Sequence, residues 1–140
     1  MPMIDVYAPA GMFADKHGLA SSLAAALMAI EGVPDIPMFR ENTAAFIHEL
    51  PADAISNVDG ATYYVRVQVL NIPGALDRDK QRAVVDRLTE LIASATGDPP
   101  PPKRIWVVLT EASDGGWGLW GHAHTNAELV QAARDERRKL

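Results

Sequence analysis

The residue with the most distinctive chemistry is Pro2, which follows Met1 and precedes a predicted strand. Initiator methionine is normally removed when the next residue is small or proline, so we expect processing to expose a secondary amine. Such an amine can act as a base or attack a carbonyl to form an iminium ion. An α-amine has a pKa of about 7.7–8.0, which falls in an apolar pocket. By itself a Met-Pro start carries little weight, so the surrounding pattern must decide whether Pro2 is catalytic.

Two arginines and one histidine are further candidates for binding a substrate. Arg66 is the cation of the third predicted strand, and Arg40 precedes the second. Each could hold a carboxylate, or lie at the surface with its aliphatic stem packed. His48 could polarise a carbonyl or be a hydrogen-bonded structural residue. His122 and His124 have no evident third ligand, so we predict no metal site.

Composition excludes several classes of function. The 140 residues suit one domain, and the net charge of −5 argues against nucleic acid as a partner. The chain has no cysteine, hence no disulfide and no thiol nucleophile. It shows no signal peptide, and its longest apolar run, residues 23–30, is too short to cross a bilayer. We therefore expect a cytoplasmic protein with no membrane segment.

The apolar pattern predicts alternating strands and helices. The third strand is the clearest, because valines at 65, 67 and 69 alternate with larger or polar side chains. In the first helix, Leu19, Leu23, Leu27 and Ile30 fall on one face, and Asp15 is the predicted N-cap. A capping box, Thr125 with Glu128, begins a C-terminal helix. The predicted strands are 3–7, 43–49, 62–70 and 104–111, and the predicted helices are 15–30, 77–95 and 126–139.

The order strand–helix–strand occurs twice. Gly11 and Glu49 of the first half match Gly74 and Glu111 of the second, about 62 residues further on. Each crossover is long enough to return a parallel strand, so we predict an α/β fold in which two βαβ repeats form a four-stranded sheet with two helices on one face. The uncovered apolar face predicts burial against other subunits. The predicted single domain is 1–140, with repeat one at about 2–50, repeat two at about 62–121 and a C-terminal helix extension at about 126–139.

Four segments carry a resemblance to a known family. They are Met1-Pro-Met-Ile-Asp-Val6, Pro73-Gly-Ala-Leu-Asp77, Arg104-Ile-Trp-Val-Val-Leu-Thr-Glu111 and Gly116-Trp-Gly-Leu-Trp-Gly121. Together with the duplication they resemble the tautomerase superfamily, which includes oxalocrotonate tautomerase, the macrophage migration inhibitory factor group and the chloroacrylic acid dehalogenases. The resemblance covers about residues 2–121. It implies a fused member with two βαβ units per chain that assembles as a homotrimer.

The resemblance also implies roles for particular residues. Pro2 matches the catalytic proline, and Trp117 matches an aromatic residue that walls the proline pocket, although simple core packing is an alternative for Trp117. The arginines that bind carboxylates in the family have no clear counterparts, since Met12 and Ala75 stand after the two strand turns. This departure counts against dehalogenase and oxalocrotonate-type activity.

These observations favour a tautomerase or isomerase, independent of cofactors, in which Pro2 moves a proton of a small enolisable carbonyl acid. Arg66 is the first choice for holding the carboxylate. One alternative is a hydratase, dehalogenase or decarboxylase of the same superfamily, which would need a group that activates water. Another is a trimeric binding protein without catalysis. The predicted substrate-binding residues are Arg66, Trp117, Arg40, His48 and Trp120.

Overall fold

The computed structural model describes residues 1–140 and contains a four-stranded sheet with the strand order β2-β1-β3-β4. β1 (Met3–Pro9) pairs in parallel with β2 (Ala44–Leu50), and β3 (Val65–Asn71) pairs in parallel with β4 (Ile105–Glu111). The two central strands, β1 and β3, are antiparallel. Each parallel pair is one half of the duplication, so the predicted α/β fold is confirmed.

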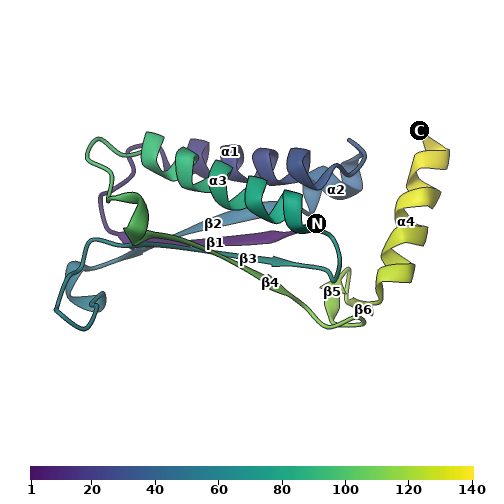
Figure 1. Ribbon diagram of the computed structural model, residues 1–140. Coiled ribbons are helices and arrows are strands. Elements are labelled where there is room, and N and C mark those ends of the chain that lie inside the picture. The colour runs from purple at the N-terminus through teal and green to yellow at the C-terminus, as the bar shows by residue number, and fades with distance from the viewer.

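Two long helices, α1 (Lys16–Glu31) and α3 (Arg78–Ser94), cover one face of the sheet (Figure 1). Alternate residues of the central strands point toward these helices, and the valines at 65, 67 and 69 are fully buried, as the alternation predicts. None of the helices combines the length and the apolar character that crossing a membrane would require. The fully buried members of the main core are Ile4, Val6, Ala8, Leu23, Leu27, Val65, Val67, Val69, Val84, Leu88 and Ile92.

A matched pair of contacts shows the duplication in three dimensions. The Gly11 N–H donates to Glu49 Oε1, and the Gly74 N–H donates to Glu111 Oε1, both at 3.2 Å. Both glycines have positive φ, 82° and 74°, a conformation that glycine adopts without steric cost. The four residues that align in the sequence therefore make one contact twice, where the first strand of each repeat turns away from the sheet.

Several short elements were not predicted. A two-residue turn, Trp120-Gly121, connects β5 and β6, and both residues have positive φ. This is the conformation of a type I′ hairpin turn, in which asparagine usually precedes glycine. Because a tryptophan stands in place of the asparagine, the sequence does not show the usual signature of a hairpin. The C-terminal helix α4 and its capping box match the prediction. The remaining elements are α2 (Pro37–Glu41), β5 (Trp117–Leu119), β6 (His122–His124), α4 (Asn126–Lys139) and the 3₁₀ turns η1 (Ala52–Ala54) and η2 (Pro102–Arg104).

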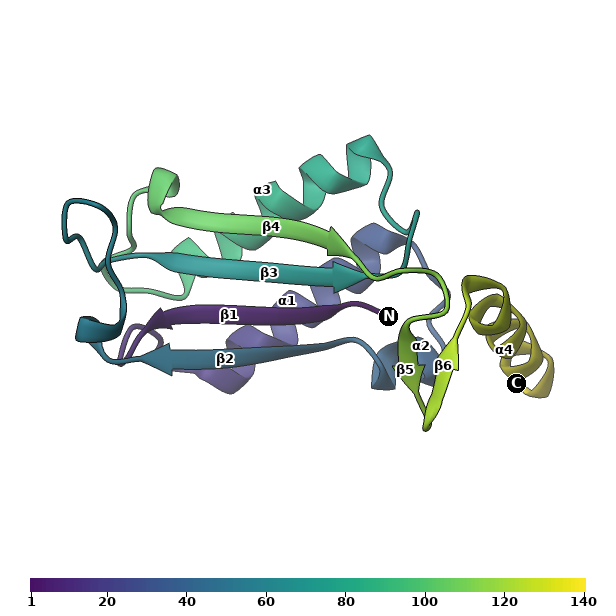
Figure 2. The same ribbon diagram turned by 90° about the horizontal axis from the view of Figure 1, so that it is seen from below.

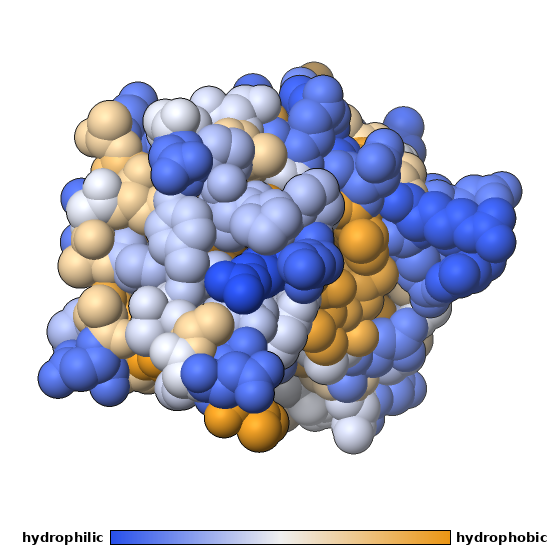
Figure 3. Space-filling view, turned by 60° about the vertical axis from the view of Figure 1, so that its left-hand side comes forward, coloured by the Kyte–Doolittle hydropathy of each residue, from blue (hydrophilic) through white to orange (hydrophobic).

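The other face of the sheet has no helix over it (Figure 2). On this open face Phe46 and Trp106 expose 52% and 51% of their surface, and Met3 and Val108 are also exposed. Hydrophobic residues are also exposed in a strip between hydrophilic areas on the side of the molecule shown in Figure 3. The open face thus exposes apolar side chains that the sequence predicts will be covered by other subunits.

Candidate active site

The N-terminus ends inside a buried apolar cluster that is separate from the main core. Met1 exposes 1% of its surface, and Pro2 beside it is fully buried. The cluster brings together the start of β1, the segment around α2, strand β5 and helix α4. The residues that pack with Met1 in this cluster, here called the N-terminal chamber, are Ile36, Met38, Trp117, Leu129 and Ala133.

Hydrogen bonds hold α4 over this chamber. The Met38 N–H donates to Glu136 Oε2 at 3.1 Å, which ties α2 to α4. At the start of α4, the Asn126 N–H donates to Asp114 Oδ1 at 2.7 Å, and its side-chain amide donates to the Pro73 carbonyl at 3.1 Å. The C-terminal extension is therefore a wall of the chamber and not a detached tail.

A buried carboxylate, Glu31, stands beside the N-terminal amine. The Met1 amine donates to Glu31 Oε1 at 3.4 Å, and only 4% of the Glu31 side chain is exposed. The second oxygen, Oε2, is buried and has no hydrogen-bond partner. Lys80 Nζ donates to the backbone carbonyl of Glu31 at 2.8 Å. The N-terminal amine therefore bonds to one oxygen of a buried carboxylate whose other oxygen has no hydrogen bond.

Glu31 was missed in the sequence, although its spacing gives a signal. The apolar stripe of α1 runs Leu19, Leu23, Leu27, and the next place at the same spacing is Glu31. We predicted Ile30 as the fourth buried residue of the stripe, but the structure buries Glu31, which is 6% exposed, and buries Ile30 only in part. A carboxylate on the buried stripe of a helix is the sequence signal for this residue.

Burial sets the state of the amine in this chamber. Removal from water lowers the pKa of the Met1 amine below its ordinary value of 8.0, while the charge and hydrogen bond of Glu31 act in the opposite direction. Desolvation is the larger effect, so the chamber favours the neutral amine. The neutral form is the one that can accept a proton.

Arg66 and His48 lie on either side of Tyr7, far in space from Pro2 of the same subunit. His48 Nε2 is 2.7 Å from Asp5 Oδ1, and its ring stacks on Tyr7 at 4.5 Å. The Arg66 guanidinium lies 5.3 Å from the centre of the Tyr7 ring on the other side of β1. Because β3 runs antiparallel to β1, Arg66 is opposite Tyr7, about 17 Å along the strand from Pro2. Arg66 and His48 thus form an open-face cluster at the other end of β1.

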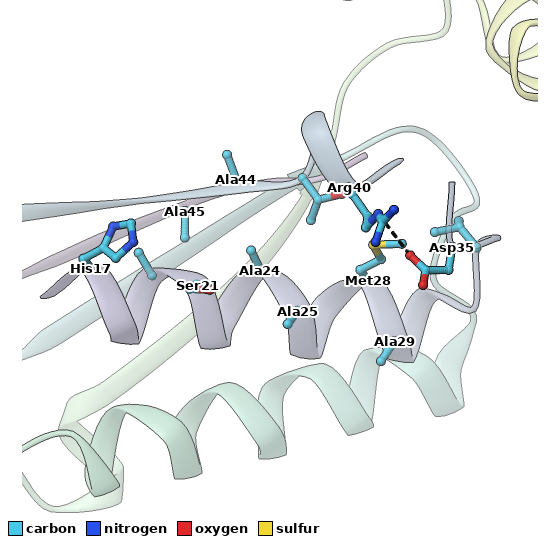
Figure 4. Close-up of a pocket in the computed structure, with 13 residues that line it drawn as sticks. His17, Ser21, Ala24, Ala25, Met28, Ala29, Asp35, Arg40, Ala44 and Ala45 are labelled. Carbon is cyan, nitrogen blue, oxygen red and sulfur yellow. Dashed lines mark ion pairs between the residues drawn. The ribbon is translucent and has the colours of Figure 1, made fainter. Parts of the chain in front are cut away.

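Two of the remaining predicted residues, Arg40 and Trp120, lie at the surface. Arg40 Nε is 3.3 Å from Asp35 Oδ1, and the pair stands at one end of a groove of about 710 Å³ between α1 and β2 (Figure 4). Alanines form much of its lining, and its other polar side chains, among them His17 and Ser21, make no charged cluster. Trp120, at the hairpin turn, is 63% exposed and packs edge-on against His124. Of the predicted aromatic residues, Trp117 is the one that the fold places with Met1.

Comparisons with known proteins support the predicted resemblance. Residues 64–126 match the family model described as "Tautomerase enzyme". The fold is similar to that of native fused 4-OT, with a TM-score of 0.73 and 24% identity over 91% of this chain and 98% of the other. These findings support the predicted resemblance to a fused member of the tautomerase superfamily. Residues 64–126 match the family model, and the whole chain has the two-repeat fold of fused 4-OT.

Other solved structures of this superfamily have the same fold. N1, a member of the cis-3-chloroacrylic acid dehalogenase family, aligns over 99% of both chains with a TM-score of 0.68 and 18% identity. The macrophage migration inhibitory factor-like protein of Entamoeba histolytica covers 89% of this chain and 96% of its own, with a TM-score of 0.66 and 18% identity. No curated protein matches the sequence significantly.

The family model matches only part of the candidate site. The matched residues include Trp117 and all of β3 and β4, whereas Pro2, Glu31 and most of α4 lie outside them. The roles of Glu31 and α4 in the N-terminal chamber must therefore be argued from the contacts of this chain.

Proposed function

We propose that this chain, once Met1 is removed, is a tautomerase that uses the Pro2 amine as a base on a small enolisable carbonyl acid. The observation that carries the proposal is the burial of the N-terminus, since Met1 packs within the N-terminal chamber and Pro2 is buried beside it. Removal of Met1 would free the Pro2 nitrogen and expose it to the space in the chamber that Met1 now fills. The match of residues 64–126 to the tautomerase family model supports the same assignment.

The reaction requires one group that accepts a proton and returns it. The Pro2 nitrogen would accept the proton of an enol hydroxyl, and the resulting ammonium would protonate a carbon of the same molecule, which yields the keto form without net loss of atoms. The chamber supports this role because burial lowers the pKa of an amine at this place, as it does for Met1. Trp117 would supply part of the dry wall.

A homotrimer is part of the proposal. The exposed Phe46 and Trp106 of the open face require cover. Structures of two fused 4-OT proteins with the same fold are described as trimers. Since Arg66 lies at the far end of β1 from Pro2, we propose that it holds the substrate carboxylate across a subunit interface, with Arg40 and His48 as further candidates for that role. Trp120, exposed on its turn, would close the pocket from an adjacent copy.

The test is ketonisation of phenylenolpyruvate by protein whose N-terminus has been defined by intact mass spectrometry. Protein without Met1 should turn over the enol. Protein that retains Met1 should not, because the Pro2 nitrogen is then an amide and the Met1 side chain fills the chamber that the substrate would enter. Pro2→Ala keeps a primary amine and should weaken turnover without unfolding the domain. A processed, trimeric sample without proline-dependent turnover of several enols would refute the proposal. Full retention of Met1 in natively expressed protein would favour the non-catalytic binding protein.

A further inference from the structure

Glu31 gives the N-terminal chamber a negative charge that the proposed reaction does not require. Its side chain is 96% buried on the sheet-facing stripe of α1, and Oε2 has no partner. A buried polar atom without a hydrogen bond is costly, and a buried charge without a partner is more so. Such a residue in an otherwise apolar chamber points to a role in binding.

The groups around Glu31 leave this charge largely uncompensated. The side chains of the N-terminal chamber are all uncharged. From α3, Lys80 bonds to the backbone carbonyl of Glu31 and forms no ion pair with its carboxylate. From α4, Glu136 adds a second acid, although its Oε2 is engaged by the Met38 N–H. The Met1 amine is the one group that bonds to the Glu31 carboxylate.

The charge of Glu31 therefore opposes an anion in the chamber. When Pro2 is a neutral base, the chamber contains a buried carboxylate and no cation in contact with it. Two like charges about 6 Å apart at an effective dielectric constant of about 20 change a binding constant by about 100-fold. In the structure the chamber is occupied by Met1, an uncharged, unbranched side chain. The same space suits an apolar group of similar size on a substrate.

We propose that Glu31 determines the substrate class of the proline site: the site takes a monoacid whose chamber-facing end is uncharged and apolar, and it rejects a diacid. The inference rests on the proposed function, because it assumes that substrate enters the space that Met1 occupies. The single carboxylate of the substrate points away from Glu31, toward the mouth of the site. Glu31 is thus a specificity-determining residue.

The direct test compares two six-carbon dienols that differ at one end. 2-Hydroxyhexa-2,4-dienoate ends in a methyl group, and 2-hydroxymuconate ends in a second carboxylate. For processed wild-type protein we expect kcat/KM to be at least about tenfold higher for the monoacid. Glu31→Gln should raise kcat/KM for the diacid and reduce the ratio at least about tenfold, while Glu31→Asp should keep the preference. Glu41→Gln, the same change at an exposed site on α2, should leave the ratio unchanged.

A second measurement does not depend on turnover. Butanal and succinic semialdehyde have the same four carbons, but one ends in a methyl group and the other in a carboxylate. The Pro2 nitrogen adds to the aldehyde carbon, water leaves, and the iminium ion is reduced to a tertiary amine by hydride from cyanoborohydride. Intact mass then reports the labelling rate. Wild type should be labelled at least about tenfold faster by butanal, and Glu31→Gln should be labelled at similar rates by both.

The outcomes separate this inference from the proposed function. Selective labelling without turnover of either dienol would refute the tautomerase and leave the role of Glu31 supported. Turnover of both dienols with equal kcat/KM, or equal labelling of the wild type, would overturn the role of Glu31 and leave the tautomerase standing. Equal loss of both activities in a folded Glu31→Gln protein with unchanged labelling selectivity would also overturn it, because Glu31 would then act in the reaction.

Discussion

Removing Met1 from the folded protein should lower its free energy of unfolding, because the residue that blocks the proposed site also packs within it. Met1 is 99% buried among the N-terminal chamber residues. Burial of a methionine side chain contributes about 1.5–3 kcal/mol, and truncation of large buried side chains costs about 2–5 kcal/mol once the cavity is included. The Met1 side chain should therefore contribute about 2–4 kcal/mol.

The amine makes this contribution depend on pH. Because burial lowers the pKa of the Met1 amine below 8.0, protonation below that pH favours the unfolded chain and offsets part of the gain. Near pH 8.5 the amine is mostly neutral in both states of the unprocessed protein, so the packing contribution is measured most directly there.

The assay is urea unfolding of two samples at equal protomer concentration, one with Met1 retained and one processed, each verified by intact mass. Equal concentration matters because assembly itself adds stability. The matched control repeats the comparison in Leu129→Ala, which widens the chamber and should shrink the effect of Met1. A difference below about 0.5 kcal/mol in the wild type would contradict the packing of Met1 that the structure shows.

Three further predictions concern the open face, the carboxylate and the buried amine. Phe46→Asp, which places a charge on the open face, should convert the proposed trimer to monomers in sedimentation, and an unchanged trimer would place the interface elsewhere. Arg66→Ala should raise KM about tenfold with little change in kcat if it holds the carboxylate equally in the ground and transition states, and unaltered steady-state kinetics would remove Arg66 from the site. The free energy of unfolding of protein that retains Met1 should rise with pH up to about 8.0. The rise should be steeper in Glu31→Gln, because the Met1 amine then loses the partner that raises its pKa. Urea midpoints that stay level over this pH range would show that the amine is solvated.

Local patterns in the sequence were sufficient to predict the repeated βαβ elements. Two patterns each depend on the geometry of a single element, which a sequence displays directly. They are the alternation of Val65, Val67 and Val69 in a strand, and the four-residue spacing of Leu19, Leu23 and Leu27 in a helix. The duplication was also visible in the sequence, because Gly11 and Glu49 recur as Gly74 and Glu111 at nearly the same separation. The sequence also singled out Pro2, through its place after Met1, and Trp117, through the resemblance.

The candidate site depends on contacts between distant elements. Glu31 meets the N-terminus because α1 crosses the sheet and ends beside the start of β1, and α4 joins the chamber through contacts with residues almost 100 positions away. Arg66 lies far from Pro2 because β1 and β3 are antiparallel, which puts the starts of the two repeats at opposite ends of the sheet. Periodicity shows which face of an element is buried, but not which end of it meets which neighbour. Strand pairing and helix packing decide that, and in this protein they place a buried acid beside the N-terminus and an arginine at the far end of the sheet.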